Sequence, residues 1–124
     1  MFEITRERTF SAAHQLRHYQ GRCERMHGHN WRVLVTVAAD ELDGQGMVMD
    51  FHDLDRLMGE AIDPYDHQHL NEAPPFDTVN PSSENLAQVI GEKVAALLPK
   101  GRVRIVRCDV FENDRSCATF HFPK

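Results

Sequence analysis

The sequence predicts an α+β fold in which two helices lie on one face of an antiparallel sheet of four strands. Segments of alternating polar and apolar residues stand near both ends of the chain, and two segments with apolar residues at helical spacing stand between them. The chain has 124 residues, a length typical of one domain, so we expect a single domain over residues 1–124. Hydrophobic residues make up 41% and charged residues 27%, a composition that is neither disordered nor membrane-spanning.

Two strands are expected in the first third of the chain, at Phe2–His14 and His27–Ala39. The second is the clearer, because its apolar residues recur at a period of two. These residues are Trp31, Val33, Val35 and Val37. Residues 40–46 are polar and contain glycine, and the short apolar run 47–49 after them suggests a hairpin that returns along the second strand.

Two amphipathic helices are expected in the middle of the chain. Asp50 can cap the first, which continues until Pro64 ends it. Ser82 or Ser83 can cap the second, which ends before Pro99.

The segment between the helices, residues 63–81, is rich in Asp, Asn, His and Pro, so we expect a long irregular loop of the kind that often carries function.

Two final strands, at residues 102–112 and 117–122, flank a turn. A small sheet of this kind has two exposed edges, which favours association with neighbouring subunits.

Charge and composition also exclude some partners. The net charge is −5, whereas nonspecific binding to a phosphate backbone needs a surplus of Lys and Arg, so we expect neither a nucleic-acid nor a membrane partner. The first residues carry Glu3 and Glu7 and lack the apolar segment of a secretory signal, so the cytoplasm is the expected location. Three scattered cysteines suit reduced thiols.

Histidines at the start of the second strand form the first candidate site. His27 and His29 are two residues apart, which places both imidazoles on one face of a strand, about 7 Å apart along the backbone. If the first strand pairs beside this one, His14 adds a third nitrogen. Three histidines with an open fourth position are the ligand set of a catalytic zinc ion. An isolated pair of this spacing is equally consistent with ordinary strand histidines.

Cys23 stands four residues before His27, so its sulfur can reach the same site. Two roles compete for it. It can be the fourth ligand of a closed structural zinc site, or it can stay off the metal as a thiolate base or nucleophile. The spacing permits both.

Asp66 and His67 form a second candidate pair within the irregular loop. A carboxylate beside an imidazole can fix its tautomer and raise its basicity, as a proton relay requires. The alternative is an Asp that caps the loop beside a solvated His.

Glu112 is the third candidate, because it shares the parity of the apolar residues of its strand. On the buried face, its carboxylate would suit the guanidine-like edge of a ligand through two parallel hydrogen bonds. A salt bridge at the strand end with Arg104 or Arg115 is the alternative.

Five motifs, in this order, resemble those of the 6-pyruvoyl-tetrahydropterin synthase and 6-carboxy-tetrahydropterin synthase family. They are Ser11-Ala12-Ala13-His14, Cys23-x-x-x-His27-Gly28-His29-Asn30, Asp66-His67-x-x-Leu70-Asn71, Pro81-Ser82-Ser83-Glu84-Asn85-Leu86 and Phe111-Glu112. The match spans nearly the whole chain, and five ordered motifs are far more specific than any one of them. The three residues between Cys23 and His27, in a short chain, resemble the 6-carboxy branch, which belongs to queuosine biosynthesis.

The resemblance implies a tunnelling fold, in which subunits join their sheets into a barrel with the helices outside. A homohexamer of two stacked trimers, with active sites at subunit interfaces, is typical of this family. The implied substrate is 7,8-dihydroneopterin triphosphate, converted to 6-carboxy-5,6,7,8-tetrahydropterin with release of acetaldehyde and triphosphate. The implied roles are Zn²⁺ on His14, His27 and His29, Cys23 as proton acceptor, His67 with Asp66 as proton relay, Glu112 as anchor of the pterin ring, and Ser82 and Ser83 as pterin contacts. Two alternatives stay open: a 6-pyruvoyl-tetrahydropterin synthase, and a noncatalytic interaction module stabilised by zinc.

Overall fold

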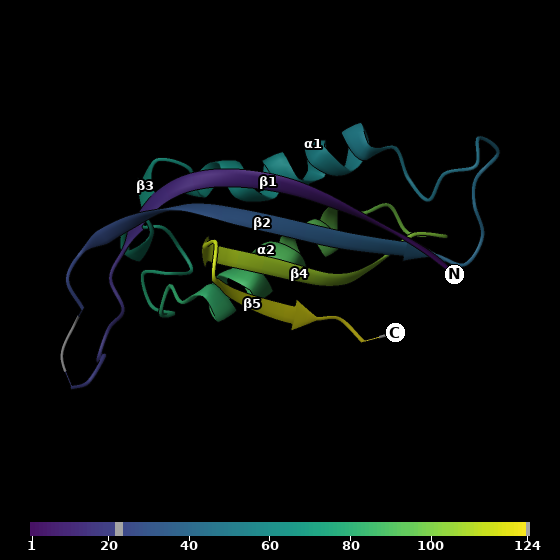
Figure 1. Cartoon of the computed structure of the whole chain (residues 1–124). Coiled ribbons are helices and arrows are strands. Elements are labelled where there is room, and N and C mark those ends of the chain that lie inside the picture. The colour runs from purple at the N-terminus through teal and green to yellow at the C-terminus, as the bar shows by residue number, and fades with distance from the viewer. Residues whose placement is uncertain (22–23, 124) are drawn as a thin grey trace.

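The structure, a computed structural model that describes residues 1–21 and 24–123, is a five-stranded sheet with two helices on one face (Figure 1). The strand order is β3-β1-β2-β4-β5. The elements are β1 (Phe2–His14), β2 (His27–Ala39), α1 (Phe51–Ile62), β3 (Gln68–His69), α2 (Ser83–Leu97), β4 (Arg104–Asn113) and β5 (Ser116–His121). The predicted α+β fold and its four long antiparallel strands are therefore confirmed.

The segment between the helices is more regular than predicted. It contains two short 3₁₀ helices, Asp63–Tyr65 and Leu70–Glu72, and between them the two-residue strand β3. This strand pairs parallel to β1, with Gln68 opposite Ala12. The sheet thus has five strands and not four.

The hairpin predicted at residues 47–49 is wrong, because the chain passes from β2 through an irregular loop directly into α1. Side chains satisfy the backbone of this loop in place of a sheet ladder. The Asp43 carboxylate accepts hydrogen bonds from the backbone N–H groups of Gln45 and Met47, and Arg102 donates to the carbonyl of Val48. Because these bonds satisfy backbone groups of the loop, the loop does not have to pair with a neighbouring strand.

Both helices begin where the sequence predicts. The Asp50 side chain accepts from the backbone N–H of His52 at the start of α1, and Ser82 accepts from the N–H of Asn85 at the start of α2. Helix α1 packs against β1, and α2 packs against β4 and β5. No helix in the described part of the chain is long and apolar enough to cross a membrane.

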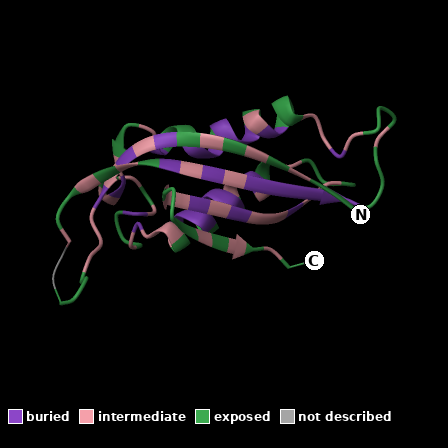
Figure 2. Cartoon of the chain, in the orientation of Figure 1, coloured by how far each residue is buried: buried purple, intermediate pink, exposed green. Residues whose placement is uncertain are grey.

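The core lies between the helices and one face of the sheet. Trp31, Val33, Val35 and Val37 of β2 are fully buried on this face, as their period predicts. Figure 2 shows the same alternation as bands of buried and more exposed residues along β1 and β2.

The pairing register places all three candidate ligands on the core face. His14 is opposite His27, and Ala12 is opposite His29. Because alternate residues share a face, His14, His27 and His29 gather at one end of the core, next to Trp31.

Candidate metal centre and the adjoining pocket

The last residue of β1 and the first residues of β2 form a compact cluster of imidazoles. His14 Nε2 lies 3.0 Å from His27 Nε2, and one nitrogen from each of the three histidines lies within 4.8 Å of the others. His14 is buried, with 2% of its surface exposed, whereas the side chains of His27 and His29 are 37% and 19% exposed. The cluster is therefore closed on the core side and open on the other.

Backbone carbonyls determine which nitrogen of two rings carries the proton. The Nδ1 atom of His14 lies 2.8 Å from the carbonyl oxygen of Pro81, and Nδ1 of His27 lies 2.8 Å from that of Arg25. A carbonyl can only accept, so each Nδ1 donates and each Nε2 of a neutral ring keeps its lone pair. Two lone pairs then face each other across 3.0 Å.

The third ring leaves a further nitrogen without a partner. His29 Nε2 is buried and makes no hydrogen bond in the described part of the chain. Native structures seldom leave such an atom unpaired unless it has a functional role. Converging imidazole nitrogens whose other nitrogens donate to backbone carbonyls are the arrangement of a metal centre.

The electrostatics favour the form of histidine that binds metal. Burial lowers the pKa of His14, and repulsion from His27 and His29 adds to this effect, although the hydrogen bond to the carbonyl of Pro81 partly offsets it. Burial also lowers the pKa of His29, although the nearby carboxylate of Glu112 partly offsets this effect. Both rings are thus held neutral, and a neutral imidazole is the metal ligand.

The donor set fits zinc. Nitrogens that each lie about 2.0–2.1 Å from a tetrahedral zinc ion are about 3.3 Å apart. The observed separations, from 3.0 Å between two nitrogens to at most 4.8 Å within the cluster, approach that value. Trp31 supports the rings, with its centroid 4.9 Å from that of His14 and 5.1 Å from that of His29.

A pocket of about 280 Å³ adjoins the cluster and brings together residues from three parts of the sequence. His14 lines it from β1, Ser82 and Ser83 line it from the start of α2, and Glu112 lines it from the end of β4. Its volume is near the lower end of the range for small-molecule sites. These are the residues that the resemblance implies for the metal and the pterin ring.

Glu112 faces the cluster. Its Oε2 lies 3.9 Å from His29 Nε2, and its side chain is half-buried, at 32% exposure. Arg104 lies 3.5 Å from Asp40 instead, and Arg115 forms no ion pair within the described residues. The salt-bridge interpretation of Glu112 therefore finds no support in this geometry.

Asp66 and His67 form the pair that their adjacency predicts. His67 Nδ1 lies 3.0 Å from Asp66 Oδ1, and the same carboxylate oxygen accepts from the backbone N–H of Ser11. The bond from Ser11 is the main cause of the lowered pKa of Asp66, so the carboxylate stays ionised. His67 has a φ of 58°, a left-handed conformation that is costly for a residue other than glycine.

The structure does not bring this pair to the pocket that Glu112 lines. The His67 side chain is 81% exposed and lines a second cavity, of about 500 Å³, which His29 of the cluster also lines. Ser11 and Asn30, which are opposite each other in the register, line the same cavity. They point to the face of the sheet opposite the helices. Cys23 lies outside the described residues, and its two candidate roles stay predictions.

Sequence reasoning missed the groups that orient the ligands. The carbonyls of Pro81 and Arg25 fix two tautomers, but a backbone carbonyl has no signature in a sequence. A partial signal existed for Pro81, because it opens one of the five motifs.

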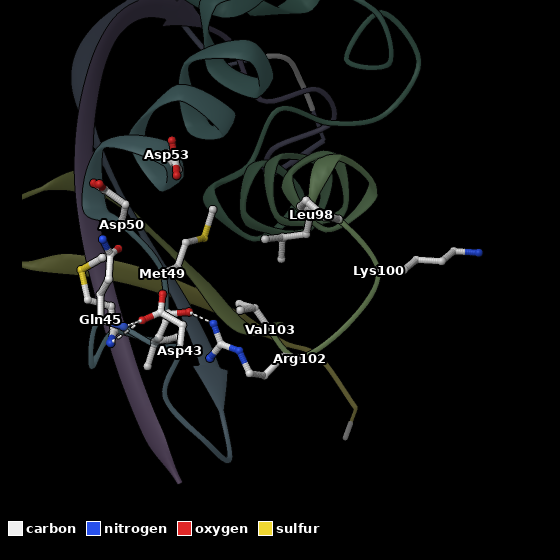
Figure 3. Close-up of a pocket in the computed structure, with 12 residues that line it drawn as sticks. Asp43, Gln45, Met49, Asp50, Asp53, Leu98, Lys100, Arg102 and Val103 are labelled. Carbon is white, nitrogen blue, oxygen red and sulfur yellow. Dashed lines mark hydrogen bonds between the residues drawn. The ribbon is translucent and has the colours of Figure 1, made fainter.

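A third cavity, of about 410 Å³, lies at the opposite end of β1 and β2, where Asp43, Asp50 and Arg102 line it (Figure 3). The protein itself satisfies Asp43 and Arg102 in this cavity. Asp43 accepts two backbone N–H bonds, and Arg102 donates to the carbonyls of Glu41 and Val48. Figure 3 shows the Lys100 side chain pointing away from the others. Among the described residues, only the three histidines gather as a metal-ligand group.

Comparison with known proteins agrees with this geometry. Residues 3–122 match the family described as 6-pyruvoyl tetrahydropterin synthase. A 6-carboxy-5,6,7,8-tetrahydropterin synthase from Synechocystis is 36% identical, over 100% of this chain and 96% of its own. The human 6-pyruvoyl tetrahydrobiopterin synthase is 34% identical, over 95% of this chain and 90% of its own. The solved structure of the Caenorhabditis elegans 6-pyruvoyl tetrahydropterin synthase is 26% identical and superposes with a TM-score of 0.81, over 99% of this chain and 98% of that one.

Proposed function

This chain belongs to the 6-pyruvoyl tetrahydropterin synthase family, and on that premise we propose that it is a zinc-dependent lyase of the 6-carboxy branch. It converts 7,8-dihydroneopterin triphosphate and one molecule of water to 6-carboxy-5,6,7,8-tetrahydropterin, acetaldehyde and triphosphate. The reaction supplies queuosine biosynthesis in the cytoplasm. The observation that carries the proposal is the cluster of three histidines, of which His14 lines the same pocket as Glu112 and His29 lies 3.9 Å from the Glu112 carboxylate.

The residues of this pocket divide the work of binding. His14, His27 and His29 hold the metal through their Nε2 atoms, whose lone pairs accept no hydrogen bond from a donor group. Zinc bound there supplies Lewis-acid chemistry, because it lowers the pKa of a coordinated hydroxyl. Glu112 accepts hydrogen bonds from the N–H groups at the edge of the pterin ring, and thereby keeps the reacting side chain close to the metal. Ser82 and Ser83 line the same pocket, and we assign their contacts to the ring.

Proton transfer is assigned to Cys23 and to the pair of Asp66 and His67. Cys23 accepts the proton from the substrate side chain, and His67, held in one tautomer by Asp66, returns a proton at the neighbouring carbon. The His67 side chain faces a different cavity from Glu112 in the same chain. We therefore assign the relay at each metal centre to His67 of a neighbouring subunit.

The sheet edges support such an assembly. In the described part of the chain, β5 has a neighbour on one side only, and β3 pairs with β1 only at Ala12 and Ala13. Unpaired edges of this kind are stable when another chain completes the ladder. We propose that the sheets join into a closed barrel in a homohexamer of two stacked trimers.

Product analysis tests this proposal. Protein loaded with zinc is incubated with 7,8-dihydroneopterin triphosphate, and the pterin product is identified by mass spectrometry. We expect 6-carboxytetrahydropterin together with acetaldehyde. A zinc-loaded protein that leaves the substrate unchanged would favour a noncatalytic module instead.

A second candidate is 6-pyruvoyl-tetrahydropterin synthase activity. Relatives named for the two activities are almost equally similar to this chain, at 36% and 34% identity. The same experiment separates the two, because the pyruvoyl product keeps the three-carbon side chain and no acetaldehyde is released.

A further inference from the structure

The backbone that leaves β1 directly after His14 is bound on its outer side by two asparagine side chains, Asn71 and Asn80. Asn71 Oδ1 accepts from the N–H of Gln15 at 2.9 Å, and Asn71 Nδ2 donates to the carbonyl of Gln15 at 2.7 Å. Asn80 repeats this pattern on Arg17, with distances of 2.8 Å and 3.3 Å. Each carboxamide therefore binds both backbone groups of one residue.

This arrangement continues the sheet where β3 ends. β3 pairs with β1 at Ala12 and Ala13, and the two carboxamides then bind the next outward-facing positions, Gln15 and Arg17. A residue of a neighbouring strand offers one N–H and one carbonyl, and a carboxamide offers the same two functions. Asn71 and Asn80, the asparagine pair, thus replace a missing strand.

The first carbonyl that orients a metal ligand is adjacent to this pair. Asn80 directly precedes Pro81, whose carbonyl accepts the Nδ1 proton of His14. The carbonyl of Asn80 is itself bound by the side-chain amide of Asn85 and by the backbone N–H of Ser82, both at 2.9 Å. Asn80 therefore joins the segment that follows His14 to the carbonyl that fixes the proton of His14.

The second orienting carbonyl, that of Arg25, is connected to residues 15–17 from their inner side. The N–H of Glu24 donates to the carbonyl of Leu16 at 2.9 Å, and the Gln15 side chain donates to the carbonyl of Glu24 at 2.7 Å. Glu24 is followed by Arg25, whose carbonyl accepts the Nδ1 proton of His27. Residues 15–17 are therefore the common support of both orienting carbonyls.

We propose that Asn71 and Asn80 are positioning residues of the metal centre, which hold residues 15–17 so that the imidazoles of His14 and His27 present their Nε2 atoms to one ion. This inference rests on the proposed function, because it concerns the same zinc site. This role also explains why both residues are asparagines. An aspartate of equal size accepts but cannot donate, so it would leave the carbonyl of residue 15 or 17 unpaired and facing a negative charge.

The experiment measures metal binding and not turnover. The zinc affinity of the full chain is determined by competition with a chromophoric chelator, for the wild type and for Asn71→Asp and Asn80→Asp. The visible absorption of the cobalt-substituted proteins reports the geometry of the site. Gln45→Glu is the matched control, because it makes the same change from amide to carboxylate in the loop at the other end of β2. Far-UV circular dichroism of the metal-free proteins establishes that each is folded.

We expect each Asn→Asp variant to bind zinc about 10- to 100-fold more weakly, the usual effect of removing a group that orients a ligand. Its cobalt spectrum should lose tetrahedral intensity, and the control should stay within about twofold of the wild type. Folded Asn→Asp variants with wild-type affinity and spectrum would overturn the inference and leave the proposed function intact. A wild type that binds no zinc would overturn both. If Asn80→Asp does not fold, Asn80→Gln takes its place, because glutamine keeps the donor and the acceptor on a longer side chain. We expect the same weakening of zinc binding, and a folded Asn80→Gln with wild-type affinity and spectrum would likewise overturn the inference.

Discussion

The two ends of β1 and β2 each carry a cavity lined by polar groups, but these groups differ in how they are satisfied. At the loop end, Asp43 accepts backbone N–H bonds and Arg102 donates to two carbonyls. At the histidine end, His29 Nε2 has no hydrogen-bond partner among the described residues, and the Nε2 atoms of His14 and His27 face each other with their lone pairs.

The difference shows what identifies a site in this fold. The loop-end cavity is the larger, at about 410 Å³ against 280 Å³ for the pocket beside the histidines. The volume of a cavity therefore does not indicate which of the two binds a ligand. An unsatisfied buried polar atom costs about 1–3 kcal/mol. The convergence of the unpaired His29 Nε2 with the Nε2 atoms of His14 and His27 therefore favours a bound cation. The loop end uses its polar groups for folding, and the histidine end keeps them for a ligand.

Removal of one metal ligand should give the largest effect. We expect His27→Ala to reduce zinc from about one ion per chain to less than about a tenth, with loss of turnover, because two imidazoles do not form a zinc site of this kind. His52→Ala removes an exposed histidine at the start of α1 and serves as the control. Metal analysis after dialysis is the measurement. Full zinc content in His27→Ala would contradict the assignment of the ligands.

Substitution of Cys23 tests whether the metal site is open or closed. We expect Cys23→Ala to retain its zinc and to lose turnover by about 10²- to 10⁴-fold, the usual contribution of a positioned acid or base. Zinc content and turnover are measured on the same preparation. Loss of the metal together with the activity would identify the sulfur as a fourth ligand and favour the structural site.

The sequence predicted elements well where one residue period or one cap decides the structure. The bounds of β1 and β2 agree with the prediction, and Asp50 and Ser82 cap their helices. It failed at residues 47–49, where the Asp43 carboxylate accepts from the N–H of Met47 and Arg102 donates to the carbonyl of Val48 in place of a sheet ladder. The bond from Arg102 joins segments that are distant in the sequence. The same is true of the pairing of β3 with β1, and β3 is too short to show a period.

The gathering of His14, His27 and His29 was predictable from the sequence, but the positions of the other candidate residues were not. The spacing of His27 and His29 places them on one face of a strand, and the register of β1 brings His14 opposite His27. No sequence pattern states that His67 lines a different cavity from Glu112, because this follows from how β3 joins the edge of β1. The roles of Cys23 and His67 stay predictions.

Glu112→Gln should give a smaller effect, confined to ligand binding. An amide replaces one acceptor oxygen with a donor that faces the N–H groups of the ring edge, and a lost hydrogen bond to a charged group costs about 1.5–3 kcal/mol. We expect the affinity for a nonreactive pterin to fall about 10- to 100-fold, with zinc content unchanged. Calorimetric titration measures this affinity, and Glu92→Gln on α2 is the matched control. An unchanged affinity would mean that Glu112 does not anchor the ring.

Asp43→Asn should give the smallest effect, and one that depends on pH. The bond from the backbone N–H of Met47 is the main cause of the lowered pKa of Asp43, and the bond from Gln45 adds to it. Because the pKa is lower in the folded protein, the carboxylate stabilises the fold above the pKa of the unfolded chain, near 4, and this contribution is lost as the pH falls through the lowered value. We therefore expect the variant to melt about 1–3 °C below the wild type at pH 7, and the difference to vanish in acid. Thermal melts of both proteins between pH 7 and pH 2.5, with zinc affinity measured at pH 7, make the comparison. An unchanged zinc affinity would mean that the loop end stabilises the fold without affecting the metal centre. A fall in zinc affinity of about 10-fold or more would show that the loop end also shapes the metal centre.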